Sequence, residues 1–549
     1  MTPIPDTLRE RLSPLGNMHN SDGGAVDRAV ARVRRPADRA YLRRAQDLRR
    51  LAALARDVRA AAPPVTGPRV LVATLRYWCD HAAFENVLAL ALRMRGADVA
   101  HVVCGGGQPA CEVGWARRAE PRPCDRCAHH TATLAQTTGF PAFRLADHLP
   151  WGPSAGDAPA DVPDIEAAID VANISIPWFF KVADHTLIEG SQAAVRDFGV
   201  AMSGVTAAAE RILDAFEPEV FFSLNGLFGP ERAIRRVAAA RGIRSPTYEI
   251  APRAGALVVS QTHPAPEMNP DAAWALHRER PLTPAQSAAL DELLAGRVRG
   301  TTSHERYFET PEEDLAVLRR DLAIPDGARV ISLFTNLSWD SACLYHDIAY
   351  PSMADWMAGA VRAVDGLDGT VLVLRVHPAE ERWGTHERAE DALRARVGEL
   401  PGNVRVVGPD RPLSSYAIVD LSALVLAYTT TVGLEAAVRG VPVAVAGETH
   451  YRGRGFTIDL DGHDDLVAAV RSAPGRLTAE QLELARRYAF TFFFRVMVPF
   501  PSVRVGGGRV LEMPERAGRL VGADPHLDWV ADRILDGAPF FLPDHLALP

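Results

Sequence analysis

Short apolar stretches and amphipathic stretches alternate along the chain in the order of strand–helix–strand units. Residues 69–75 form an apolar run typical of a buried strand, 84–95 carry apolar residues at helical spacing, and 98–103 form a second apolar run. The same order returns between residues 220 and 250. Strands that alternate with helices in this way predict a parallel, doubly wound sheet.

A second array of strands follows a proline-containing helical segment at 263–302. Its expected strands, each followed by a polar or glycine-containing loop, are 329–334, 370–376, 404–407, 423–427 and 442–446. The predicted fold is therefore α/β, with two Rossmann-like doubly wound domains facing a cleft and an N-terminal helical extension. Doubly wound sheets bind ligands at the carboxyl ends of their strands, so the cleft is the expected binding site.

The pattern divides the chain into four parts. They are a helical, arginine-rich extension at 1–66, an N-terminal Rossmann-like domain with a cysteine-cluster insertion at 67–310, a C-terminal Rossmann-like domain at 311–500, and a C-terminal tail at 501–549. The extension holds 13 arginines and 7 acidic residues, and it either contacts anionic lipid or a partner, or packs as a solvated helix on the next domain. The acids on its polar face and the lack of a row of aromatic anchors favour the second interpretation.

Composition narrows the classes of function. The 549 residues carry a formal net charge of -8, so no overall basic field favours nucleic acid, and no nucleic-acid partner is expected. Lys181 is the single lysine, so a G-K-[ST] phosphate loop is absent and a Walker-type nucleotidase is excluded. The sequence has no apolar run near the ~18–20 residues that span a bilayer, nor an apolar secretion signal at its start. The expected location is the cytoplasm, with contact at the inner face of the membrane left open through the extension.

Polar loops follow three strands of the second array, and a shared chemistry connects them. An arginine binds phosphate at two points, an imidazole donates to a phosphate oxygen, and hydroxyls with free N–H groups at the start of a helix bind anions. Each loop also has an ordinary interpretation, as a surface turn, a helix cap or a solvated loop. Their convergence at strand ends predicts a phosphate site. Its candidate residues are Arg375, His377, Thr429, Thr430, Thr431, Gly433, His450 and Tyr451, and Glu435 is expected to accept hydrogen bonds from the ribose hydroxyls of a nucleotide.

Four of the six cysteines lie close together in the chain: Cys104, Cys111, Cys124 and Cys127. In a protein expected in the cytoplasm, such clustering indicates metal rather than disulfides. Four thiolates suit tetrahedral zinc, which is the first choice and would be structural, or an iron–sulfur cluster. The substitute ligands are His129 and His130. The alternative is that the thiols bind nothing.

Several segments resemble bacterial capsule polysaccharide biosynthesis proteins. In the second array these are RVHPAE (375–380), YTTTVGLEAAVRGVPVAVAG (428–447) and THYRGRGFT (449–457). Elsewhere they are HAAFENVLALALRMRGADV (81–99), NGLFGPERA (225–233), RGIRSPTYE (241–249) and ARRYAFTFFFR (485–495). This family includes 3-deoxy-manno-octulosonic acid (Kdo) transferases of the GT-B fold, in which two Rossmann domains face a cleft.

The resemblance implies an enzyme, a nucleotide-sugar-dependent glycosyltransferase that moves a sugar from a nucleotide-sugar donor to a capsule or other surface-glycan or glycolipid acceptor. It implies that the C-terminal domain binds the donor, through Arg375, His377, Thr429, Thr431 and Glu435, and that the N-terminal domain binds the acceptor. No organic cofactor is expected, and a catalytic divalent cation is not required. The alternatives are a sugar-nucleotide 2-epimerase or a CDP-alditol phosphotransferase of the same fold, or a non-catalytic metal or redox scaffold that uses the cysteine cluster.

A transferase that inverts the anomeric centre needs a base near the acceptor hydroxyl. His81 is the first candidate, followed by Asp80 and Glu231, because each follows a predicted strand of the N-terminal domain and faces the cleft by topology. Each has an ordinary alternative: Asp80 as a helix cap, His81 as a surface histidine, and Glu231 as a charge near a helix N-terminus.

Overall fold

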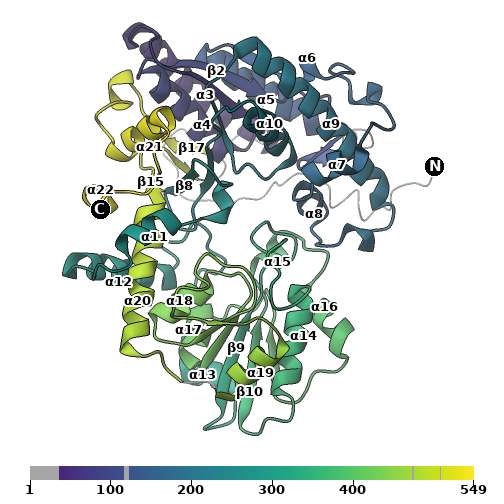
Figure 1. The fold of residues 1–549 in the computed structure, drawn as a ribbon, viewed down its shortest axis with the longest axis vertical. Helices are drawn as coiled ribbons and strands as arrows, with labels where there is room; N and C mark the ends of the chain where they lie inside the picture. Colours follow the sequence, from purple (N-terminus) through teal and green to yellow (C-terminus); the bar gives the residue numbers. More distant parts are fainter. Residues whose placement is uncertain (1–35, 116–122, 473–474, 507–508, 549) are drawn as a thin grey trace.

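The computed structural model describes residues 36–115, 123–472, 475–506 and 509–548, which build two halves around two largely parallel sheets (Figure 1). The first sheet has the strand order β15-β8-β7-β6-β1-β2-β5. Its strands are β1 (Arg69–Thr74), β2 (Asp98–Val103), β5 (Ala142–Arg144), β6 (Val220–Leu224), β7 (Thr247–Ile250), β8 (Ala256–Ser260) and β15 (Met497–Pro499). All neighbours pair in parallel except β8, which is antiparallel to both β7 and β15.

The second sheet is parallel throughout, with the order β11-β10-β9-β12-β13-β14. Its strands are β9 (Arg329–Phe334), β10 (Thr370–Arg375), β11 (Val404–Val407), β12 (Leu424–Ala427), β13 (Val443–Val445) and β14 (Ile458–Asp459). β9 lies at the centre, between β10 and β12, so the loops that follow these three strands leave the sheet side by side.

Burial explains why the apolar runs of the sequence became strands. Every residue of β10 is buried, and so are all residues of β1 after Arg69, as expected where helices cover both faces of a parallel sheet. Helices connect successive strands, among them α4 (Cys79–Arg93) after β1 and α10 (Gly229–Ala240) after β6. The prediction of an α/β fold with two doubly wound, Rossmann-like domains is confirmed.

The chain leaves the first half and later returns to it. It passes to the second half through α11 (Asp271–His277) and α12 (Pro284–Val298) and comes back through α20 (Ala479–Phe490), which leads into β15 of the first sheet. Beyond β15, helix α21 (Pro525–Asp536) packs on α4, in the upper half of Figure 1. The described part of the predicted tail, 501–549, therefore contributes to the core of the first half.

The N-terminal extension is helical where the structure describes it. α3 (Pro36–Ala61) buries Leu51, Leu54 and Val58 in the same apolar core as α21, which matches the interpretation of a helix packed on the next domain. Residues 1–35 of the predicted extension lie outside the described residues, and lipid contact stays a prediction. Among the described helices, none is both long and apolar enough to cross a bilayer.

Candidate functional site

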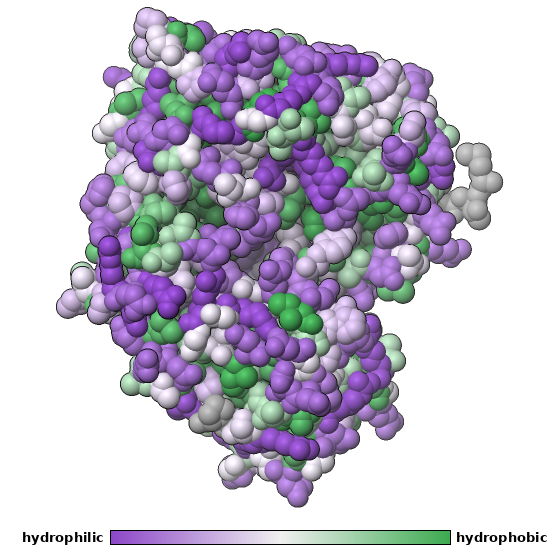
Figure 2. Space-filling view, viewed as in Figure 1, coloured by the Kyte–Doolittle hydropathy of each residue, from purple (hydrophilic) through white to green (hydrophobic). Residues whose placement is uncertain are grey.

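The carboxyl ends of the two sheets meet around a small aromatic cluster. Helix α8 (Ser175–Phe180) brings Trp178 from the first half, and the second half brings Trp339, from the loop after β9, and Trp383, which follows α15 (Ala379–Arg382). The backbone N–H of His386 also donates to the carbonyl of Lys181, at 3.0 Å. Figure 2 shows the surface recessed between the halves. This junction is where the topology predicted a binding site.

The amine of Lys181 lies on the ring faces of this cluster. Its Nζ is 3.2 Å from the ring centroid of Trp178, 4.2 Å from that of Trp339 and 5.7 Å from that of Trp383. Among the described residues, the buried amine has no hydrogen-bond partner. Burial lowers the pKa of Lys181 to about 7, against the opposing effect of Asp340. A group that changes charge near neutral pH therefore lies between the two halves.

Asp80 and His81 lie in the first turn of α4, directly after the loop that follows β1. The Nδ1 atom of His81 is 3.3 Å from the hydroxyl of Tyr248 on β7, and the ring is half-buried beside Trp78. Burial, with the charge of Arg76, lowers the pKa of His81 to about 3. Burial raises the pKa of Asp80. At neutral pH His81 is therefore an uncharged imidazole, able to accept a proton.

Tyr248 connects His81 to a second buried acid. Its hydroxyl donates to Glu85, one turn further along α4, at 2.8 Å. Burial raises the pKa of Glu85 to about 8, although the hydrogen bonds from Tyr248 and Thr74 oppose this. Burial also raises the pKa of Tyr248. The three side chains form a hydrogen-bonded row that leads from the junction into the first half.

Glu231 belongs to a different network. Its carboxylate is buried in α10 and accepts two hydrogen bonds from Arg76, one of them at 2.9 Å. Arg76 also donates to Glu112, at 2.8 Å, and Glu112 accepts from Ser175. Removing one partner of such a buried pair leaves an uncompensated charge, so these groups hold one another in place. This position favours a structural role for Glu231, and its predicted catalytic role gains no support.

Glu249, which is not among the residues predicted from the sequence, is the last residue but one of β7. Burial raises the pKa of Glu249 to about 7, opposed by hydrogen bonds from the Ile250 N–H and from the side chain of Asn225. The charge of Asp340, from the loop after β9 of the other half, raises the pKa further. A general base works best with a pKa near the operating pH. The sequence feature that could have identified Glu249 is that it is an acid near the end of a predicted strand.

The chain just after α12 connects the candidate residues of the two halves. Glu305 acts electrostatically on Asp80 and pairs with Arg382 of α15, at 2.5 Å. Two residues later, the ring of Tyr307 stands edge-on to His377, with 5.6 Å between the centroids. The structure therefore brings Asp80 of the first half and His377 of the second to opposite ends of one short segment.

His377 follows β10, and its ring is positioned by its own turn. Nδ1 accepts a hydrogen bond from the Ala379 N–H at 3.1 Å, and the backbone N–H donates to the hydroxyl of Thr335 at 2.9 Å. Burial, with the charge of Arg375, lowers the pKa of His377 to about 4. Since Nδ1 is the acceptor, the neutral ring carries its proton on Nε2, where it can donate to an anion.

Two other residues of the predicted phosphate site turn into the core of the second half. The guanidinium of Arg375 is buried and donates to the carbonyls of Gly408, at 2.5 Å, and Arg411, at 3.1 Å. Glu435 is buried and pairs with Arg297 of α12, at 2.5 Å. Both side chains therefore have structural partners, and a nucleotide contact by either stays a prediction.

The remaining predicted phosphate residues surround helix α18 (Val432–Val438). Tyr451 is fully buried and donates to the carbonyl of Thr430, at 2.6 Å. A Cβ on Gly433 would lie 2.2 Å from the Tyr451 hydroxyl, so glycine is needed there for packing. His450 lies 3.0 Å from the hydroxyl of Tyr488 and stacks on an adjacent aromatic ring.

Two threonines next to α18 are less enclosed. Thr429 and Thr431 are half-buried at the end of β12, and the N–H of Thr429 donates to Asn336 of the neighbouring loop, at 3.3 Å. The hydroxyl oxygen of Thr429 is itself buried, so His377 and Thr431 are the members of the predicted phosphate site best placed to meet a ligand at the junction.

All four cysteines of the predicted metal site line one pocket of the first half. Cys104 follows β2, Cys111 ends β3 (Ala110–Cys111), and Cys124 and Cys127 lie in the first two turns of α5 (Pro123–Thr138). As the side chains stand, the described residues contain no group of three His, Cys, Asp or Glu side chains arranged to hold a metal ion. Zinc or an iron–sulfur cluster therefore stays a prediction.

Comparisons with known proteins return distant similarities in structure only; no family model and no curated protein matches the chain. KpsC, the β-Kdo 2,4 transferase of Thermosulfurimonas dismutans, is 13% identical with a TM-score of 0.34, over 55% of this chain and 87% of that one. The UDP-GlcNAc 2-epimerase of Neisseria meningitidis is 11% identical with a TM-score of 0.26, over 76% and 93%. CalG4, the calicheamicin glycosyltransferase, is 15% identical with a TM-score of 0.27, over 78% and 94%. Similarity at this level assigns neither substrate nor reaction.

Proposed function

We propose that this protein is a glycosyltransferase that moves a sugar from a nucleotide-sugar donor to a hydroxyl of a surface-glycan acceptor. One observation carries the proposal: the carboxyl ends of two parallel sheets meet at a junction to which both halves supply ionisable side chains with shifted pKa values. Such groups, gathered where a fold binds ligands, are typical of catalytic sites. The resemblance of the segments around His81 and His377 to capsule polysaccharide enzymes supports the same reaction class.

The first half supplies the base. In an inverting transfer, an acceptor oxygen attacks the anomeric carbon, the bond from that carbon to the phosphate oxygen breaks, and the hydroxyl proton passes to a base. His81 is our first candidate for this base because of its position in the first turn of α4, although its pKa of about 3 is far below the near-neutral value that best suits a general base. Asp80, beside it, and Glu249, with a pKa of about 7, are two further candidates from this half.

The second half supplies donor contacts. The nucleotide leaves with the electron pair of the broken bond, so its phosphate needs hydrogen-bond donors as the negative charge develops. The Nε2–H of His377 follows β10 and the hydroxyl of Thr431 follows β12, on either side of the central strand β9, and they would supply them. We assign these two side chains to the donor phosphate.

The test is turnover by the full chain with a panel of nucleotide sugars and capsule-type oligosaccharide acceptors. Free nucleotide and the mass of the product are the readouts. A positioned base contributes about 10²–10⁴-fold, so His81→Ala should lower turnover at least 100-fold. The control is His545→Ala, an exposed histidine far along the chain, which should retain activity. Full activity in His81→Ala would contradict the assigned base, and an isomerised nucleotide sugar formed without acceptor would contradict the transferase.

A further inference from the structure

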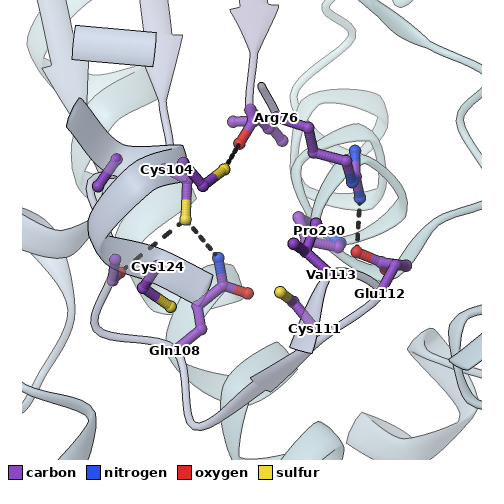
Figure 3. A pocket seen from close by; sticks show the side chains of 12 residues that line it. Arg76, Cys104, Gln108, Cys111, Glu112, Val113, Cys124 and Pro230 are labelled. Atoms are coloured by element: carbon purple, nitrogen blue, oxygen red, sulfur yellow. Dashed lines mark hydrogen bonds and ion pairs between the residues drawn. The ribbon is translucent and has the colours of Figure 1, made fainter. Parts of the chain in front are cut away.

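Four thiols from three separate segments surround a single cavity of the first half. Cys104 comes from the loop after β2, Cys111 from the short β3–β4 ribbon (β4, Gly114–Trp115), and Cys124 and Cys127 from the start of α5. Figure 3 shows the sulfur atoms of Cys104, Cys111 and Cys124 on the walls of one pocket. The local sequence of each segment does not by itself explain why cysteines from three separate segments surround one cavity.

The groups beside the thiols suit a negatively charged sulfur centre. The side-chain amide of Gln108 donates a hydrogen bond to the sulfur of Cys104, at 3.1 Å. Groups that hydrogen-bond to the metal-ligating side chains are a usual part of metal sites. The guanidinium of Arg76 also lines the pocket and places a positive charge beside the thiols. The carbonyl oxygen of the Gln108 side chain is buried and has no hydrogen-bond partner among the residues that the structure describes.

The size of the cavity favours one ion over a cluster. Its volume is about 30 Å³. A buried water needs about 10–15 Å³ measured in the same way, so the space suits one or two atoms. Four thiolates around a single ion are the ligand set of structural zinc, which is tetrahedral. Of the two groups considered, zinc and an iron–sulfur cluster, a single zinc ion therefore fits both the four thiols and the volume of the cavity.

We propose that Cys104, Cys111, Cys124 and Cys127 bind one zinc ion. On binding, each thiol releases its proton to solvent, and four sulfur–zinc bonds form with no change of oxidation state. As the side chains stand, the described residues form no metal site, so the sulfur atoms must turn from the pocket walls onto the ion. The zinc then joins the β3–β4 ribbon, the loop after β2 and α5, three segments with little apolar core of their own.

The ion would also help to hold in place the buried ion pairs that lie beside the candidate catalytic groups. Glu112 directly follows Cys111 and pairs with Arg76, which in turn pairs with Glu231 at the start of α10. Arg76 also lies over the ring of Trp78, with 5.1 Å between its guanidinium carbon and the ring centroid. Trp78 packs on both His81 and Trp178 at the junction. Zinc at the four cysteines therefore sits one residue from a continuous chain of contacts to the candidate active site.

The test is the metal content of the full-length protein, measured by inductively coupled plasma mass spectrometry after purification without chelators. We expect about one zinc per chain. The variants Cys111→Ser and Cys124→Ser should lose most of it, whereas Cys343→Ser, which removes a buried cysteine of the second half, should keep it. Zinc-free protein that also fails to take up added zinc, or equal zinc in all four proteins, would overturn the proposal, and so would stoichiometric iron with visible absorbance.

A second measurement uses the wild-type chain in case the serine variants do not fold. Cobalt(II) added to zinc-depleted protein should give the visible bands of a tetrahedral thiolate site, and one equivalent of zinc should remove them. Weak octahedral bands alone would overturn the proposal. Neither readout uses a nucleotide or turnover, so the zinc site and the proposed transferase can fail independently.

Discussion

Lys181 is the single lysine of the chain, and its amine lies on tryptophan rings from both halves of the molecule. An ammonium over an aromatic face is attracted by the ring, but losing water without gaining a hydrogen bond opposes the charged form. Burial prevails here and lowers the pKa of Lys181 to about 7. The unfolded chain keeps the usual lysine pKa, so between about pH 7 and 10.5 it binds a proton that the folded chain does not.

We expect protein labelled at the lysine ε-carbon to give one ¹³C resonance that titrates near pH 7. Because one lysine is present, the assignment needs no further variant. The linked expectation is that folding stability gains a contribution as pH rises from 7 toward 10, at about 1.4 kcal/mol per pKa unit at most. Lys181→Met should lack this gain in thermal denaturation at a series of pH values. A midpoint near 10.5 would show that the amine is not enclosed by the tryptophans.

At the scale of elements, three helices far apart in the chain share one apolar core. α3, α4 and α21 pack together, and the residues of α21 that face this core are Leu527, Val530, Ala531 and Ile534. They recur three and four residues apart, as one face of a helix requires. The last helix of the chain is therefore part of the first half, which would lose one wall of its core without it.

Two valines near the C-terminus offer a matched test of this packing. Val530 is fully buried in α21, whereas Val521 is 43% exposed. Val530→Ala removes buried methyl groups and leaves a cavity, so it should lower the free energy of unfolding by about 2 kcal/mol. Val521→Ala should change it by less than about 0.5 kcal/mol. Urea denaturation measures both, and equal effects would show that α21 is a loosely attached tail.

The sequence predicted the strands well because a buried parallel strand is a local pattern of apolar residues. The antiparallel pairing of β15 with β8 was not predictable in the same way, since Met497 and Val258 are far apart in the chain. The directions in which polar side chains point at strand ends were also not predictable from the sequence. Arg375 turns toward carbonyls more than 30 residues away, and Glu435 toward Arg297, 138 residues away. His377 kept its predicted place at the junction because its own turn positions its ring.

At the scale of the whole molecule, the junction is where two sheets, two sets of loops and the segment after α12 come together. Contacts between the halves include the tryptophan cluster with Lys181, the Glu305–Arg382 pair and the Tyr307–His377 contact. A ligand that touches both halves would add to these contacts and stabilise the whole chain. Binding at the junction should therefore be visible in global stability.

The most direct test is thermal denaturation of the full chain with CMP, CDP, UDP, GDP or dTDP at saturating concentration. At about 100 times its dissociation constant, a ligand stabilises by about 2.7 kcal/mol. This corresponds to a rise in Tm of about 5–10 °C if a domain of roughly 150–250 residues unfolds by itself, and of about 2 °C if the whole chain unfolds as one unit. We expect one nucleotide to give this shift, His377→Ala to lose it, and His545→Ala to retain it. If no nucleotide raises Tm, or if His377→Ala shifts as the wild type does, the junction is not the donor site.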